Sequence, residues 1–385
     1  MINSIGIKNF KSIKDIEVKL PSFCAVIGCN AAGKTNLIQA INFIKRLVTG
    51  TDMYIAQRKI CLLPQELFNF NELSKEIFFR ITIETKNDRK YELVVKINLV
   101  NDRDLPQLAI RYEKLEKIIH NGGKKEKVKI YEREGEVLKN QEGKDIPLAV
   151  DSDVLAISVY KNSEAIEVKR FFSNVFITEQ EMIDSRKSIA SMNEDSLAGL
   201  LVHLKHRDLD RYEQFKKIVS KILPDFNQFV EFDVEKKPGV KEDTSEERSL
   251  LVLLEEKNLK GKLSMKSVSG GDLRTLYLIA RAIDMKEGSS LFIEEIENGI
   301  HPKRLNDLLE HLDTISKRRD LQIIFTTHSP NVINNFKPSS ILFVRKDKDK
   351  GTELKIIEEF SEIEPIKKFL NKGGKLLDYI TSRFG

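Results

Sequence analysis

The stretch GCNAAGKT, at residues 28–35, constrains the fold of this chain more than any other. It matches the pattern G-x-x-x-x-G-K-[ST] in full, the apolar run FCAVIG leads into it, and a helical pattern with one apolar face begins at Lys34. Glycines let successive N–H groups turn inward and a helix N-terminus adds positive potential, so this arrangement encloses a phosphate group. An accidental glycine-rich turn is the alternative, but it would require neither the strand nor the helix. The sequence therefore predicts an α/β fold with a phosphate-binding loop.

The last residues of this loop indicate the cofactors. The ammonium group of Lys34 would neutralise charge on the β- and γ-phosphates of a nucleotide. The hydroxyl of Thr35 would ligate Mg²⁺ beside those phosphates. We therefore expect ATP and Mg²⁺ as the cofactors of this protein.

Polar residues follow two further apolar strand patterns. In SSLFIEEIENGIHP (residues 289–302) we assign Glu294 to Mg²⁺ and Glu295 to the attacking water, as its general base. A strand that merely ends in acids at its solvent edge is the alternative. In LQIIFTTHSP (residues 321–330), His328 stands where an open α/β sheet places ligand-facing groups, so we assign it to sensing the γ-phosphate. For His301 a functional role and a packing role stay equally open.

The stretch KSVSGGDLR, from Lys266, places two glycines before an amphipathic helix pattern. Ser269 can cap that helix, with Asp272 three residues on as an imperfect capping box. A cap does not require Gly270 and Gly271, however. Because glycine is a poor helix former, the pair indicates that the backbone approaches another group closely here.

The remaining chain suggests three lobes, which a chain of 385 residues is long enough to form. We expect an N-terminal lobe at residues 1–190 with a β-rich arm at about 76–137, a helical insertion or lid at 191–263, and a C-terminal lobe at 264–385. The segment 194–224 has the spacing of two helices, and LLVLLEE that of a strand. The lysine-rich run at 124–129 suggests an exposed loop.

Composition places the protein in the cytoplasm, without a membrane partner. No apolar run reaches the roughly 18 residues that a membrane span needs, and the N-terminus has no apolar segment of a secretory signal. The three cysteines have no metal-site spacing and fit a reducing compartment. The net charge of +5 arises from 64 basic and 59 acidic residues, which describes a mixed surface and does not locate a basic track for nucleic acid.

The order of these motifs resembles the head of an ABC-type ATPase. SVSGGD is similar to its signature, and IKNFKSIKDIEVKL to the N-terminal strands of the SMC/Rad50/RecF branch. FIEEIENGIHP looks like OLD-type (overcoming-lysogenization-defect) relatives in bacterial antiphage defence, such as Septu, PARIS and Gabija. The resemblance covers residues of about 1–45 and 264–332. It implies an α/β head with a mixed P-loop sheet flanked by helices, a β-rich arm and a helical insertion.

The resemblance also implies site residues. Those that bind nucleotide would be Gly28, Asn30, Gly33, Lys34, Thr35, Asn36, Lys11 and Ser12. Those that present the signature to the nucleotide of a second copy would be Ser269, Gly270 and Gly271. The metal would be held by Thr35, Glu294 and the Q-loop candidate Gln180, while Glu295 and His328 would be catalytic.

The chain departs from its apparent relatives in four ways. Glu294 replaces the usual Walker B aspartate, and Val268 replaces the usual leucine of the signature. After His328 we find no separated Glu and Asp-x-Asp set of the kind that a two-metal nuclease needs. The long coiled coil of SMC proteins is also missing. We therefore expect an ATPase head without either usual appendage.

The resemblance, taken with these departures, implies an ATP-driven switch with slow, regulated hydrolysis. The chain would form a homodimer or larger assembly around ATP and control a separate effector, a nuclease or toxin, in bacterial antiviral defence. The alternative is a DNA-repair ATPase of the RecF/SMC type that clamps duplex DNA directly, so DNA is a further candidate partner. A transporter subunit fits the β-rich region poorly, and a self-contained nuclease lacks the acids noted above.

Overall fold

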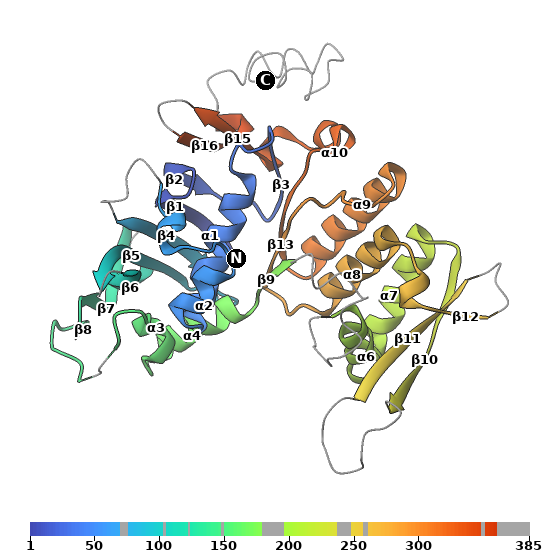
Figure 1. The fold of residues 1–385 in the computed structure, drawn as a ribbon, viewed down its shortest axis with the longest axis horizontal. Helices are drawn as coiled ribbons and strands as arrows, with labels where there is room; N and C mark the ends of the chain where they lie inside the picture. The colour runs from blue at the N-terminus through green and yellow to red at the C-terminus, as the bar shows by residue number, and fades with distance from the viewer. Residues whose placement is uncertain are drawn as a thin grey trace. The chain divides into compact units, whose positions relative to one another are not determined.

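The computed structural model describes residues 1–69, 76–102, 105–121, 124–147, 150–178, 196–236, 248–256, 261–347 and 351–359 (Figure 1). The chain forms two compact units, the first made of Met1–Ile177, Glu287–Glu294 and Gln322–Gly385 and the second of Thr178–Lys286 and Glu295–Leu321. The expected α/β class, with a mixed sheet and flanking helices, is confirmed. No helix in the described ranges is long and apolar enough to cross a membrane.

The first unit is built on a mixed sheet of 13 strands among the described residues, in the order β8-β7-β6-β5-β4-β1-β2-β16-β15-β3-β14-β13-β9. Its strands are β1 (Ile2–Phe10), β2 (Ile13–Lys19), β3 (Phe23–Gly28), β4 (Ile77–Glu84), β5 (Lys90–Asp102), β6 (Leu105–Asn121), β7 (Lys124–Glu134), β8 (Val137–Asn140), β9 (Val175–Thr178), β13 (Ser290–Ile293), β14 (Gln322–Thr326), β15 (Ile341–Asp347) and β16 (Gly351–Ile356). Strands β13, β14, β3 and β15 run parallel to one another. The pairs β1–β2 and β15–β16 are antiparallel, and so is each successive pair from β4 to β8.

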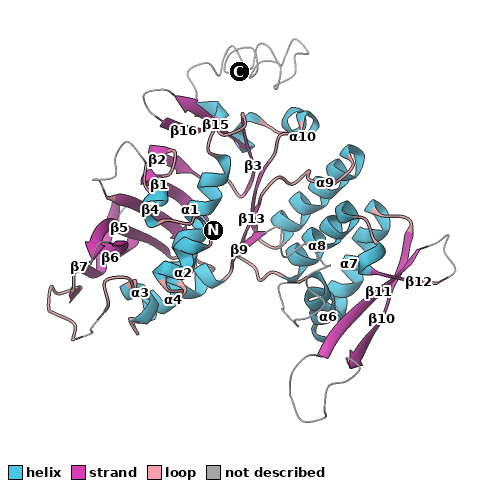
Figure 2. Cartoon of the chain, in the orientation of Figure 1, coloured by secondary structure: helices cyan, strands magenta, loops and turns pink. Residues whose placement is uncertain are grey.

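The helix that the apolar spacing predicts from Lys34 is present, and it is one of several helices that flank this sheet (Figure 2). They are α1 (Lys34–Val48), α2 (Met53–Arg58), α3 (Ala156–Val159), α4 (Ser163–Ser173) and α10 (Pro330–Asn335), with 3₁₀ turns at η1 (Pro64–Leu67), η5 (Pro338–Ser340) and η6 (Ile357–Glu359). In α1 the apolar face is buried, and Phe43 packs against Phe10 and Phe79 of the sheet. Burial of each such side chain stabilises the fold by about 1.5–3 kcal/mol. This packing fixes α1 directly behind the loop at residues 28–33.

Strands β4 to β8 form the predicted β-rich arm, which extends to Asn140. A turn near residues 86–88 joins β4 to β5, with Asp88 in the left-handed region (φ 56°) and its N–H bonded to Thr85 O at 3.1 Å. The prediction of a loop at residues 124–129 is wrong, because this run pairs with β6 as the start of β7. Its lysines stay compatible with a strand because they reach glutamates across the sheet, as Lys127 reaches Glu92 at 2.5 Å.

The second unit combines helices with a small antiparallel sheet. Its elements are α6 (Leu197–Arg207), α7 (Leu209–Ile222), β10 (Phe226–Lys236), β11 (Arg248–Glu256), β12 (Lys262–Ser264), η4 (Met265–Ser267), α8 (Gly270–Asp284) and α9 (Pro302–Arg318). The two helices predicted at 194–224 are confirmed as α6 and α7. Asp208 separates them, since it ends α6 and its carboxylate accepts the N–H of Arg211 as the cap of α7. The units cut across the three lobes expected from the sequence, because β13 and β14 join the large sheet whereas α8 and α9 pack with α6 and α7.

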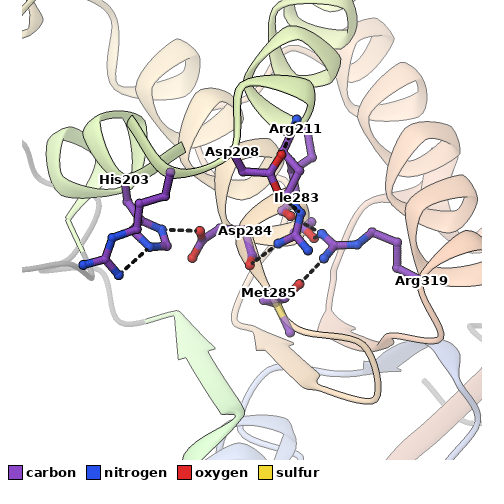
Figure 3. Close-up of polar contacts among 9 residues, drawn as sticks. His203, Asp208, Arg211, Ile283, Asp284, Met285 and Arg319 are labelled. Atoms are coloured by element: carbon purple, nitrogen blue, oxygen red, sulfur yellow. Dashed lines mark hydrogen bonds and ion pairs between the residues drawn. The ribbon is translucent and has the colours of Figure 1, made fainter. Parts of the chain in front are cut away.

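Arginines brace the C-terminal end of α8 (Figure 3). Arg319 donates hydrogen bonds to the carbonyls of Ala282, Ile283 and Met285, and Arg211 donates to that of Asp284 at 3.1 Å. These carbonyls have no partner inside the helix, so cationic donors stabilise both the bonds and the helix dipole. The end of α8 opposite to Gly270 is therefore fixed within its own unit.

A histidine joins the same cluster. His203 Nδ1 lies 2.6 Å from a carboxylate oxygen of Asp284, and Arg207 lies 3.2 Å from His203 Nε2. Because a guanidinium group only donates hydrogen bonds, His203 Nε2 accepts one from Arg207. The other ring nitrogen, Nδ1, then donates its N–H to the Asp284 carboxylate. The hydrogen bond between His203 and Asp284 ties α6 to α8.

Candidate functional site

The parallel strands of the first unit bring the predicted nucleotide-binding residues to one edge of the sheet. Strands β3, β14 and β13 are successive neighbours, with Val26 opposite Thr326 and Phe325 opposite Ile293. Their carboxyl ends therefore meet at the same edge. The glycine-rich loop follows β3, Glu294 follows β13 and His328 follows β14. The topology groups the loop with two motifs that lie more than 250 residues further along the chain.

The loop closes around its own lysine. Lys34 is 7% exposed, and its ammonium donates to the carbonyls of Gly28 at 2.8 Å and Cys29 at 2.9 Å. The left-handed residues Ala31 (φ 60°) and Gly33 (φ 113°) produce the turn. A side chain at Gly28 would place its Cβ 2.1 Å from the carbonyl oxygen of Val344, so the loop must be glycine at that point. This is a compact turn that carries a positive charge.

The N-terminus of α1 adds to this potential. Gly33 is its N-cap, no side chain caps it, and its first turn contains no acid. The N–H groups of the first turn are therefore available to an anion, and the helix dipole favours a negative charge there. Thr35 is exposed next to this end. The residues present fit the phosphates of a nucleotide, and the hydroxyl of Thr35 and the carboxylate of Glu294 would be the chain's own oxygen ligands for a Mg²⁺ ion.

Lys11 and Ser12 lie beside the same helix. Lys11 has a left-handed backbone (φ 50°), and its ammonium donates to Gln39 Oε1 at 2.8 Å. Ser12 Oγ accepts a hydrogen bond from Asn36 Nδ2 at 2.7 Å. The structure thus brings Lys11, Ser12 and Asn36 together at the start of α1. Gln180 lies outside the described residues.

Glu295, the predicted base, has an unusual backbone. It is exposed and left-handed (φ 44°), a conformation that costs free energy for a residue with a side chain. Two donors hold its carbonyl oxygen: Asn298 N–H at 2.9 Å and Arg274 Nη2 at 2.9 Å. Arg274 was missed by the sequence reasoning. The signal that could have revealed it is a charged residue within a helix pattern of mostly apolar residues. In the structure this side chain is 6% exposed.

At the signature turn, Ser269 caps the helix as predicted, and packing within the chain explains one of the two glycines. Ser269 Oγ accepts the N–H of Asp272 at 3.1 Å, while the Asp272 carboxylate pairs with Arg304, so only half of the capping box forms. A Cβ at Gly271 would lie 1.9 Å from the carbonyl oxygen of Gly299, so packing within the chain already requires Gly271. A Cβ at Gly270 would meet no atom of the described residues within 4 Å. Among the described residues, nothing packed near Gly270 requires a glycine at that position.

The two histidines differ in their surroundings. His328 is exposed after β14. His301 is the N-cap of α9, and its Nδ1 accepts the N–H of Lys303 at 3.3 Å, which supports the packing role for this residue. In the part of the chain that is described, no group of three or more His, Cys, Asp or Glu side chains is placed to hold a metal ion. A Mg²⁺ ion at Thr35 and Glu294 would therefore need phosphate oxygens among its ligands.

A glycine-rich loop between a buried parallel strand and a helix, with an acid after the neighbouring strand, defines a P-loop nucleotide-binding protein. The chain belongs to the family described as "AAA domain, putative AbiEii toxin, Type IV TA system", whose model matches residues 23–334. It is an ABC-type ATPase of the SMC/Rad50/OLD branch.

Relatives of assigned function share about a fifth to a quarter of their residues with this chain. An "ATP/GTP phosphatase" of Helicobacter pylori is 24% identical, with 86% of each chain covered. An "OLD nuclease" of Thermus scotoductus is 21% identical over 97% of this chain and 68% of its own length. The "Old nuclease" of Escherichia phage P2 is 23% identical over 92% of this chain and 61% of its own length.

A solved structure supports the fold. The SMC head in complex with the C-winged helix domain of ScpA covers 92% of this chain and 96% of its own, with a TM-score of 0.50 and 15% identity. At this identity the likeness concerns the fold alone, and it agrees with the mixed sheet and flanking helices described above.

Proposed function

We propose that this chain is an ATP-driven switch whose nucleotide state sets its assembly. The observation that carries the proposal is the meeting of the phosphate-binding loop, Glu294 and His328 at one edge of the sheet. ATP with Mg²⁺ would supply a phosphoanhydride bond and a divalent charge at that edge. Hydrolysis would be slow, because a switch must keep its ATP-bound state long enough to act.

The residues of the chain then have separate tasks. Lys34 and the N–H groups at the start of α1 bind and orient the phosphates, Thr35 and Glu294 hold the metal, and Glu295 accepts a proton from the attacking water. His328 contacts the γ-phosphate. The arginine bond to the Glu295 carbonyl would keep the base in its strained conformation and so oriented.

A second copy completes the site in this proposal. Ser269 and Gly270 are exposed at the start of α8, and the space around a Cβ at Gly270 is open. Their hydroxyl and N–H groups would reach a γ-phosphate that another copy holds. Hydrolysis removes that phosphate, and the two copies separate.

The output passes to a separate effector. Nucleases among the relatives support a nuclease, and the family description supports a toxin, as the controlled activity in bacterial antiviral defence in the cytoplasm. A direct DNA clamp receives less support, because lysines of the arm such as Lys114 and Lys127 are paired with Glu116 and Glu92. Such pairs leave less positive charge for phosphates.

The test uses the purified full-length chain with MgATP or MgADP. We expect phosphate release, and a mass of at least two chains by light scattering with MgATP but not with MgADP. Lys34→Ala should lose both effects, because it removes the phosphate-binding charge. Wild-type protein that releases no phosphate and keeps one mass in both nucleotides would refute the switch. Salt-sensitive binding to duplex DNA by the chain alone would favour the clamp instead.

Alkylation of Cys29 provides an independent measure of nucleotide binding, because this cysteine lies exposed within the phosphate-binding loop. Burial raises the pKa of the Cys24 thiol to about 12 and also raises the pKa of Cys61, so Cys29 should be alkylated first at pH 8. MgATP at ten times its Kd leaves about one-tenth of the sites free, so alkylation of Cys29 should slow about tenfold. Mass spectrometry of peptides would follow it, with Cys61 as the internal control. Equal rates with and without MgATP would place the nucleotide elsewhere.

A further inference from the structure

Thr352 connects the last described strand with the phosphate-binding loop. It lies on β16, is 1% exposed, and its N–H donates to Ser12 O at 3.1 Å. Its hydroxyl lies 3.0 Å from the carbonyl oxygen of Ala32 and 2.7 Å from Ser12 Oγ. Neither the motifs nor the sequence spacing draw attention to this residue, which is 320 positions from Ala32.

The hydrogen bonds around Thr352 have one possible direction. A carbonyl oxygen only accepts, so the single hydroxyl proton of Thr352 is donated to Ala32 O. Ser12 must then donate its own proton to Thr352 Oγ1, and Ser12 Oγ is left to accept from Asn36 Nδ2 at 2.7 Å. The result is a directed chain from Asn36 through Ser12 and Thr352 to the loop. Each hydroxyl both donates and accepts, which strengthens its neighbours' bonds.

This chain of bonds fixes the orientation of one peptide group in the loop. In a planar trans peptide the C=O and N–H point in opposite directions. When Thr352 holds the Ala32 carbonyl, the N–H of Gly33 is turned away from Thr352. Among the described residues that N–H donates no hydrogen bond, and it adjoins the first turn of α1.

The glycine at this place is also explained. A Cβ at Gly33 would stand 2.6 Å from Thr352 Oγ1 and 2.9 Å from Ser12 Oγ. The side chains of Thr352 and Ser12 therefore fill the space next to the loop, so a residue with a Cβ does not fit at this position.

We propose that Thr352 is a positioning residue for the nucleotide site, which holds the Ala32 carbonyl so that the Gly33 N–H faces the bound phosphates. The inference rests on the proposed function in that the loop binds a nucleotide. Thr352 touches no phosphate itself, so it acts through the loop. Removing its hydroxyl should therefore weaken nucleotide binding without changing any group that contacts the nucleotide.

The experiment compares three variants of the full-length chain by calorimetric titration with MgADP. Thr352→Val keeps the shape and removes the hydroxyl, and we expect its Kd to rise about tenfold, the effect of losing a buried hydrogen-bonded hydroxyl. Thr352→Ser keeps the hydroxyl and should bind within about twofold of wild type. Thr85→Val is the matched control, since this hydroxyl lies between β4 and β5 and donates to Glu167 Oε1 of α4 at 2.7 Å. It should lower the melting temperature and leave the Kd unchanged.

Equal Kd values for Thr352→Val and Thr85→Val would overturn the inference, because the hydroxyl would then matter only for stability. If Thr352→Val does not fold, Thr352→Cys replaces it. Its weak S–H donor should give a Kd between those of the serine variant and the tenfold-weakened state, and a wild-type Kd would again overturn the inference. MgADP binding does not require hydrolysis. Absent phosphate release by wild type would therefore count against the proposed switch and leave this comparison intact.

Discussion

Replacing Glu295 with glutamine should lower the rate of ATP hydrolysis about 100-fold or more while ATP binding remains. Glutamine has nearly the shape of glutamate but does not take a proton from water at neutral pH, and a positioned base is worth about 10²–10⁴ in rate. The nucleotide would stay intact, so the assembly that depends on it should accumulate. We expect a long-lived ATP-bound dimer or larger species by light scattering, with intact ATP recovered from it.

Glu297→Gln is the matched control, since this acid lies two residues away in the same loop. It should hydrolyse ATP at a rate close to that of wild type. If Glu295→Gln hydrolyses ATP as fast as wild type, Glu295 is not the base. If Glu295→Gln is slow but binds ATP more than about tenfold more weakly, the residue supports the nucleotide rather than the water.

Replacing Ser269 with arginine should abolish ATP-dependent association and leave ATP binding by each monomer largely unchanged. Ser269 is exposed at the start of α8 next to Gly270, whose surroundings are open, so a long side chain there would occupy the space that a second copy needs. We expect the dimer dissociation constant to rise about 100-fold, roughly 2.7 kcal/mol. Analytical ultracentrifugation with MgATP would measure it, in the Glu295→Gln background that keeps ATP intact.

Ser269→Ala separates this effect from helix capping. Both variants lose the cap bond to Asp272, which is worth about 1 kcal/mol of stability. Only arginine adds bulk, so the alanine variant should associate far better than the arginine variant. Weak ATP binding by monomeric Ser269→Arg would mean that the turn serves the nucleotide of its own chain, contrary to the proposal.

The structure changes the interpretation of the signature glycines. From the sequence, the pair Gly270-Gly271 indicates approach by another group, and a second copy is the natural candidate. The structure shows that position 271 must be glycine because it packs against Gly299 of the same chain. A Cβ at position 271 would overlap the backbone carbonyl of Gly299. Gly270 and Ser269 therefore remain as the residues that indicate a second copy. The local sequence could not separate the two glycines, because close packing between distant loops leaves no pattern in it.

Local patterns predicted most elements of the fold. The period of the apolar residues gave the helix after Lys34, the two helices at 194–224 and the buried strands at the site, because each pattern reflects a single face to be buried. The prediction of a loop at residues 124–129 is wrong because it considered exposure and not strand pairing. Its lysines are exposed as expected, but backbone pairing with β6 makes it a strand, and pairing depends on a partner that exposure does not reveal.

The sequence by itself determined the residue types of the proposed site and their short spacing: glycines that turn, a lysine for phosphate, and acids for metal and water. Tertiary structure alone decided how that chemistry is held. Thr352 donates a hydrogen bond to the Ala32 carbonyl of the loop, and Arg274 donates one to the carbonyl of Glu295. Arg319 donates to carbonyls at the C-terminal end of α8. Each of these contacts joins residues that are tens to hundreds of positions apart, and only folding brings such pairs within the 3 Å or so at which a hydrogen bond forms.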